Sequence, residues 1–113
     1  MTNLIITKNF MRQPLRRMNL NGVNWRWIDL TDAALNKASL VGAILLGAIL
    51  TRVKLRNANL RDANLLNADL SYADLTGANL TGADLSLTNL EAANFSQANI
   101  TGAIFLPDQS EGK

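Results

Sequence analysis

The sequence predicts an all-β solenoid, a coil built from short extended segments, and three regularities indicate it. Every fifth residue from Leu20 to Phe105 is large and apolar, through eighteen consecutive positions of which fourteen are leucine. Two residues before each of these stands Ala in thirteen pentads, and one residue before stands Asn or Asp in twelve. The residues that follow are mostly small or polar. One local unit of five residues therefore repeats without a break.

A period of five excludes the two common regular elements. Five residues of α-helix turn the chain by about 500°, so the leucines would be spread round the whole helix. On a flat strand an odd step puts successive leucines on opposite faces, and a plain sheet would expose half of them. Within one pentad, Ala and Leu are two residues apart and share a face. If the next two residues bend the chain, each pentad becomes one side of a polygonal coil.

The pattern A(N/D)LXX, which runs from Met18 to Phe105, resembles that of the pentapeptide-repeat proteins. The resemblance implies a right-handed quadrilateral β-helix with four pentads in each coil and about four to five coils in this chain. Leucines twenty residues apart, such as Leu20 and Leu40, would then stack along one inner face. Ala suits the second inward position because a narrow coil has little room. We expect Asn and Asp to bond nearby backbone groups and hold each bend.

The repeat divides the chain into three predicted parts. Residues 18–105 form the β-helix. Residues 1–17 keep their large residues in phase but lack the Ala partners, which predicts an N-terminal cap or a degenerate first coil. Residues 106–113 read as a polar C-terminal tail. Because the open ends of a stacked coil need covers, Phe95 and Phe105, on opposite sides of the last coil, are placed to fill and close its end.

Composition argues against catalysis. The 113 residues include no cysteine and no histidine, which removes the usual thiolate and imidazole ligands and the usual proton shuttle. No pairing of a nucleophile with a base is visible, and the carboxylates mostly occupy repeat positions. We therefore expect no enzyme activity, no cofactor and no metal site. The N-terminus carries no export signal and no apolar run has the length of a membrane span, which predicts a cytoplasmic protein without a transmembrane segment.

Some outward residues are apolar where the repeat is polar. They cluster round one coil and include one residue a coil further on: Val41, Ile44, Leu46, Ile49 and Leu66. A contiguous apolar patch predicts a contact surface for a partner or for a second copy, and a coil end offers another route to self-association. The alternative is a patch covered by side-chain stems or by the N-terminal segment. Trp27, Tyr72 and Leu87 are isolated, and we expect them to be incidental packing.

Basic residues form a second group near the N-terminal end. Residues 1–61 carry ten Lys and Arg against two acids, whereas residues 62–113 carry one Lys against seven acids. Spacing by twenty places seven of the cations on two adjacent faces: Arg12, Arg16, Arg17, Lys37, Arg52, Lys54 and Arg56. Such a patch suits phosphate, nucleic acid, an acidic protein or anionic lipid. Asp32 interrupts it and no aromatic residues are interleaved, which favours the alternative of a solvated face.

These features favour a non-enzymatic scaffold or protein interaction module with an unknown protein partner. One alternative is nucleic-acid or anionic-surface binding through the basic residues. Another comes from the resemblance, because some pentapeptide-repeat proteins imitate the DNA duplex and inhibit DNA gyrase. That activity needs a long, acidic, usually dimeric rod. The short repeat, the net charge of +2 and the lack of an evident dimer module disfavour it.

Overall fold

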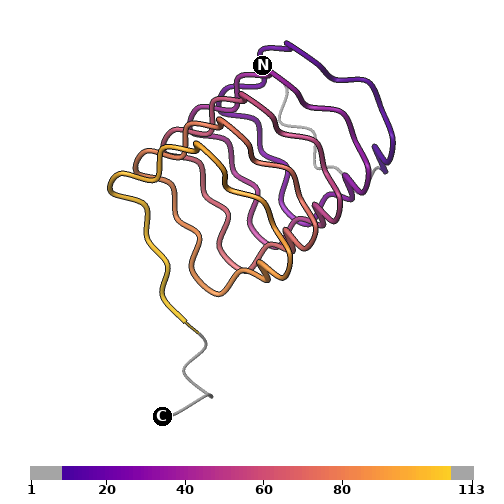
Figure 1. The fold of residues 1–113 in the computed structure, drawn as a ribbon. Helices are drawn as coiled ribbons and strands as arrows, with labels where there is room; N and C mark the ends of the chain where they lie inside the picture. Colours follow the sequence, from indigo (N-terminus) through magenta and orange to yellow (C-terminus); the bar gives the residue numbers. More distant parts are fainter. Residues whose placement is uncertain (1–8, 108–113) are drawn as a thin grey trace.

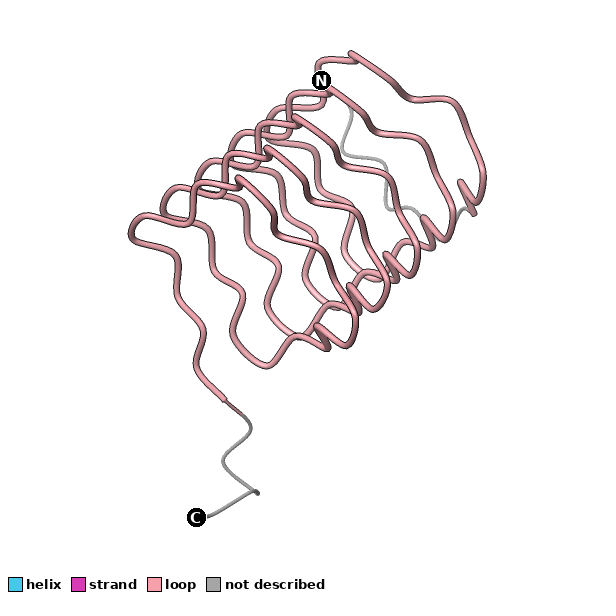
Figure 2. Ribbon diagram, viewed as in Figure 1, coloured by secondary structure: helices cyan, strands magenta, loops and turns pink. Residues whose placement is uncertain are grey.

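The chain winds into a stack of four-sided coils (Figure 1), and the computed structural model describes residues 9–107. Sixteen parallel bridges join residues that are twenty apart, from Asn9 with Asp29 to Asp84 with Ile104. Four pentads therefore make one coil, as predicted. Within residues 9–107 there is no helix and no longer strand, because each pentad contributes a single bridge residue between two turns (Figure 2). The coil is a β-solenoid whose strands are only a few residues long.

Most pentads use their backbone donors in the same way. In residues 58–62, the N–H groups of positions 58, 59, 60 and 62 donate to main-chain carbonyls at 2.7 to 3.0 Å. Three of these bonds reach a neighbouring coil, and the fourth closes the turn within the coil. The fifth N–H, that of Arg61, donates to Oδ1 of Asn59 at 3.1 Å. Where Asn or Asp stands before the large inward residue, its side chain thus completes the backbone pairing, with the exception of Asn24.

The bend falls at the second residue after each large inward residue. Within residues 9–107, the thirteen non-glycine residues with positive φ and the six such glycines all occupy this corner position, with φ from 57° to 72°. Glycine, Asn and Asp adopt this left-handed conformation readily, whereas other residues incur a cost of about 1 kcal/mol. A large side chain at the corner position therefore lowers the stability of the coil slightly, and its presence there suggests a role other than folding.

The core is a column of leucine and alanine side chains. From Ile28 to Leu85 every inward residue is buried, with exposed fractions of 0 or 1%. Each buried leucine contributes about 2 kcal/mol of apolar transfer free energy. Ala suits the other inward position because the remaining space is filled at ordinary packing density. The predicted inward set is confirmed across these coils.

The two ends of the described coil differ. Residues 9–17 already lie in the ladder, through bridges from Asn9 and Pro14, and the ring of Phe10 packs 5.4 Å from that of Trp25. The rest of the predicted N-terminal part, residues 1–8, and most of the predicted tail, residues 108–113, lie outside the described residues. At the other end Phe105 stays 41% exposed. Of the two residues expected to close this end, Phe95 is partly buried and packs against the core, and closure by Phe105 stays a prediction.

Candidate interaction surfaces

Some outward side chains stabilise the coil by accepting backbone N–H groups, and others do not. Twelve Asn or Asp side chains accept the N–H two positions further on, at 2.8 to 3.1 Å. Five of the positions that lack this side chain are Pro14, Ala34, Ile44, Ile49 and Lys54. After each of the five, the N–H in question has no hydrogen-bond acceptor among residues 9–107. At these places the chain gives up a bond that the repeat makes elsewhere.

The seven predicted cations line a single face of the coil and its two bordering corners, which we call the basic face. Pro14, Ala34 and Lys54 follow one another up the middle of this face in the bridge ladder. Arg12 and Arg52 lie in the corner column on one side, and Arg16, Arg17, Lys37 and Arg56 lie in the corner on the other. The sequence placed them on two adjacent faces. The structure brings them closer together, because each corner borders the face that follows it as well as the one before.

Two acids hold two of these cations. The Arg52 guanidinium donates to both carboxylate oxygens of Asp32, from Nε at 2.9 Å and from Nη2 at 3.0 Å. This hydrogen bond lowers the pKa of Asp32, and the charges of Lys54 and Arg12 add to the effect. Arg56 lies 3.9 Å from a carboxylate oxygen of Asp74. Asp32 lies between Arg12 and Arg52 in their corner column and pairs with Arg52, so it interrupts the row of cations on that side.

The apolar residues form a belt round one coil. Val41 and Leu46 stand at two successive corners, and Ile44 and Ile49 stand in the middle of two adjacent sides, with Leu66 above Leu46. These five residues are the apolar belt. Ile49 is 40% exposed and the other four are half-buried. The belt is contiguous along the chain, but it turns through a corner and does not present one flat patch.

Trp27 extends this belt, and sequence reasoning missed it. Its side chain is 62% exposed and its φ is 61°, a rare conformation for a bulky residue. The indole lies on the backbone of Gly47, since a Cβ added there would be 2.0 Å from a ring carbon. The pairing of a large corner residue with a glycine twenty residues later was the available signal. The Trp27 side chain therefore packs against the next coil at Gly47 and is not isolated.

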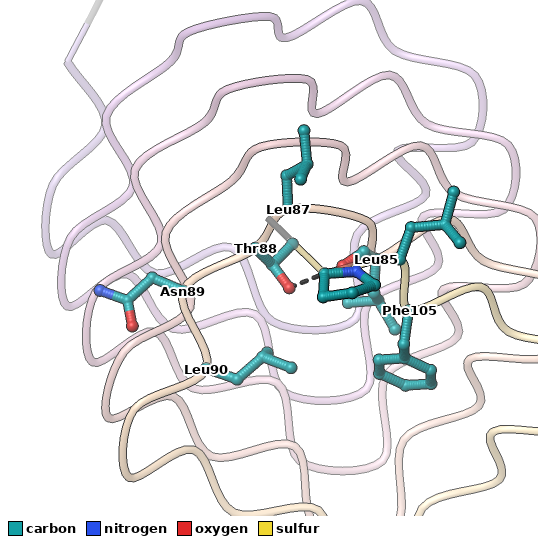
Figure 3. A pocket seen from close by; sticks show the side chains of 8 residues that line it. Leu85, Leu87, Thr88, Asn89, Leu90 and Phe105 are labelled. Carbon is teal, nitrogen blue, oxygen red and sulfur yellow. Dashed lines mark hydrogen bonds between the residues drawn. The ribbon is translucent and has the colours of Figure 1, made fainter. Parts of the chain in front are cut away.

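A hollow of about 560 Å³ lies at the C-terminal end of the coil, and Figure 3 shows side chains that line it. It is lined by Leu85, Leu87, Thr88, Asn89, Leu90, Phe105, Leu106 and Pro107. The Thr88 hydroxyl already donates to the carbonyl oxygen of Leu85 at 2.7 Å. The side chains that line the hollow include no acid or base that could transfer a proton. The hollow has polar and apolar walls in about equal parts and lies at the end of the last described coil.

Four of the carboxylates serve the repeat. Asp29, Asp69, Asp74 and Asp84 each accept the N–H two residues on, at 2.9 or 3.0 Å. The hydrogen bond from Thr76 lowers the pKa of Asp74, although partial burial opposes it. Within residues 9–107 no three acidic side chains gather where they could hold a metal ion. No helix in this part of the chain is long and apolar enough to cross a membrane.

Comparisons with known proteins agree with this geometry. The family profile "Pentapeptide repeats (8 copies)" matches residues 15–47, 48–86 and 68–105. No curated protein sequence matches the chain. A pentapeptide repeat protein from the thylakoid lumen of Arabidopsis thaliana has a similar structure, with 35% identity and a TM-score of 0.77 over 80% of this chain and 63% of that one.

A more distant likeness adds only to the fold. A trypsin-treated form of QnrB1, a plasmid-mediated fluoroquinolone resistance protein, has 15% identity and a TM-score of 0.50 over 91% of this chain and 59% of that one. The chain thus spans about three fifths of the length of both structures. The solved relatives are right-handed quadrilateral β-helices. The family profile matches most of the chain, and the solved relative has the same four-sided coil. The chain therefore belongs to the pentapeptide-repeat family.

Proposed function

We propose that the chain is a non-enzymatic module that binds another protein through outward side chains of its first three described coils. One observation carries this proposal. Four of the positions that lack the Asn or Asp acceptor are Ala34, Ile44, Ile49 and Lys54, and they lie on the basic face or the apolar belt. A coil selected for stability alone has no reason to lose these hydrogen bonds, whereas a contact surface does.

The absence of catalytic groups supports the non-enzymatic part. The sequence contains no cysteine or histidine. The four aspartates that precede inward leucines each accept a backbone N–H group, which gives them a structural role in the coil. The hollow at the C-terminal end also lacks ionisable lining. Binding is the activity that the outward side chains can perform.

Affinity capture with matched surface variants tests this function. The bait proteins are wild type, Ile44→Asn/Ile49→Asn, Lys37→Gln/Lys54→Gln, and the control Arg26→Gln/Arg61→Gln, which removes two cations away from the basic face. After cross-linking in an extract of the host cells, a protein partner is expected with wild type and control. It should be lost from at least one of the two surface variants. The same set of captured proteins on every bait, or none above bare resin, would overturn the proposal.

Charge opposes the alternative of a gyrase-inhibiting DNA mimic. Such a mimic presents acidic side chains, whereas the basic face presents seven cations in three coils. A supercoiling assay at high micromolar protein is therefore expected to show no inhibition of gyrase. Inhibition that survives loss of Lys37 and Lys54 would support the mimic instead.

The cytoplasmic location stays a prediction from the sequence, since the Arabidopsis protein comes from a thylakoid lumen. Fractionation of the host cells, with the chain detected by immunoblot, tests it. Recovery in a membrane-enclosed compartment would contradict it.

A further inference from the structure

We propose that the basic face binds a short acidic segment of the partner protein, an inference that rests on the proposed function. The first argument is the charge that remains available. Arg52 is held by Asp32, and Arg56 lies near Asp74. The other five cations of the face form no salt bridge within residues 9–107: Arg12, Arg16, Arg17, Lys37 and Lys54. Five free cations on one face favour a ligand that carries several negative charges.

The second argument is that the fold does not need Arg or Lys at these corner positions. Arg17 and Lys37 stand in a corner column where φ is about 61°, and the same column holds Asn57, Gly77 and Gln97 in later coils. Glycine and Asn suit this left-handed conformation better than Arg or Lys do. Cations therefore occupy the corner in the first two coils at a conformational cost, which a binding role explains.

The third argument is the shape of the face. Its middle is small in the first two coils, with Pro14 and then Ala34. One bordering corner carries Arg12 and the Asp32–Arg52 pair, and the other corner carries only cations among its charged residues. Neighbouring coils are about 4.8 Å apart, so three coils cover about 10 Å. Four residues of extended chain separate the two corners by at most about 13 Å. The part of the basic face between the two corners therefore has the size of an extended segment of three or four residues. Carboxylates of such a segment can reach arginines at either corner.

The surroundings favour a protein segment over nucleic acid. Asp74 follows Lys54 in the fourth coil of the same face, and Asp29 and Asp69 stand in the middle of the neighbouring face. A long phosphate polymer that crossed the patch would meet these carboxylates. The first three coils of the basic face also carry no aromatic side chain on which a base could stack. A short acidic segment avoids both difficulties.

Isothermal titration with an octaglutamate peptide tests the proposal in a buffer of about 20 mM ionic strength, where screening is weak. The variant Lys37→Gln/Lys54→Gln should bind the peptide about three- to thirtyfold more weakly than wild type, as expected for the loss of two exposed ion pairs. Gln97 already occupies the column of Lys37, so the variant should fold; a thermal melt checks this. The control Arg26→Gln/Arg61→Gln, with the same change in net charge, should bind within about twofold of wild type.

Two further probes separate the other anionic partners. A nine-nucleotide single strand with eight phosphates and vesicles that contain phosphatidylserine are expected to bind more weakly than octaglutamate at equal charge. Tighter binding of either one would overturn the choice of a protein segment. No binding of octaglutamate, or an equal loss in the control variant, would overturn the basic face as the site. In that case a partner captured through the apolar belt would leave the proposed function standing.

Discussion

Replacing Ala34 by Asn should stabilise the protein, because it returns to the coil a side-chain oxygen that twelve other pentads possess. In those pentads the oxygen accepts the N–H two residues on, as when Asn79 accepts the N–H of Thr81 at 3.0 Å. Ala34 offers no such oxygen, and the N–H of Asn36 has no acceptor among the described residues. Ala34 is only partly buried, so the larger side chain has room on the outward side.

The magnitude follows from one added hydrogen bond. A hydrogen bond contributes a net of about 0.5 to 1.5 kcal/mol, because the N–H is otherwise bonded to water. Fixing the Asn side chain opposes this by a few tenths of a kcal/mol, which leaves about 0.5 to 1 kcal/mol. For a domain of this size, that corresponds to a rise in melting temperature of about 2 to 8 °C. The reverse change, Asn79→Ala, should lower stability by at least as much.

Urea unfolding and thermal melts measure both effects. The control is Ala34→Gln, which carries the same amide one methylene further out and cannot close the same turn. We expect the Ala34→Asn variant to be more stable than wild type and the Ala34→Gln variant to be about as stable as wild type or less stable. A stability of Ala34→Asn at or below that of wild type, or equal gains for Asn and Gln, would refute the role given to the side-chain oxygen.

Three other outcomes follow from the structure. Ala78→Leu should overpack the coil and lower the free energy of unfolding by about 1 to 3 kcal/mol, whereas an unchanged melt would mean that Ala78 does not face inward. Gly47→Ala should displace the indole of Trp27 and change its fluorescence, because the new Cβ meets the ring; an unchanged spectrum would place the ring elsewhere. Asp32 has a lowered pKa, so its contribution to stability is present above its unfolded pKa and is lost as pH falls through the folded value. Asp32→Asn should therefore lose less stability than wild type between pH 5 and pH 2 in urea melts, and equal losses would contradict this.

The sequence predicted the fold well because a period of five leaves few geometries. The inward Leu and Ala, the twenty-residue register and the bonding of Asn and Asp to backbone N–H groups all follow from local rules that the repeat applies many times. The positions of Ile44, Ile49 and Lys54 on outward columns could be counted in the same way. Each of these is a property of one pentad or of the step between pentads.

What the sequence did not reveal depends on contacts between coils. Arg16 and Arg52 lie at the two edges of one face because each corner of the coil borders two faces, the one before it and the one after it. The seating of Trp27 on Gly47 depends on a ring that folds across to the next coil. The exposure of Phe105 depends on where the described ladder stops. None of these is a property of a single pentad, so local pattern alone could not give them.

The central claim is that partner binding resides where the outward residues depart from the repeat, on the basic face. Amide chemical shifts of the ¹⁵N-labelled protein, recorded during titration with octaglutamate, test this directly. The account predicts that the shifts that move gather in residues 12–17, 34–37 and 52–56 and leave the surroundings of Arg26 and Arg61 unchanged. Shifts spread evenly over all cations, or gathered round Arg26 and Arg61, would contradict it.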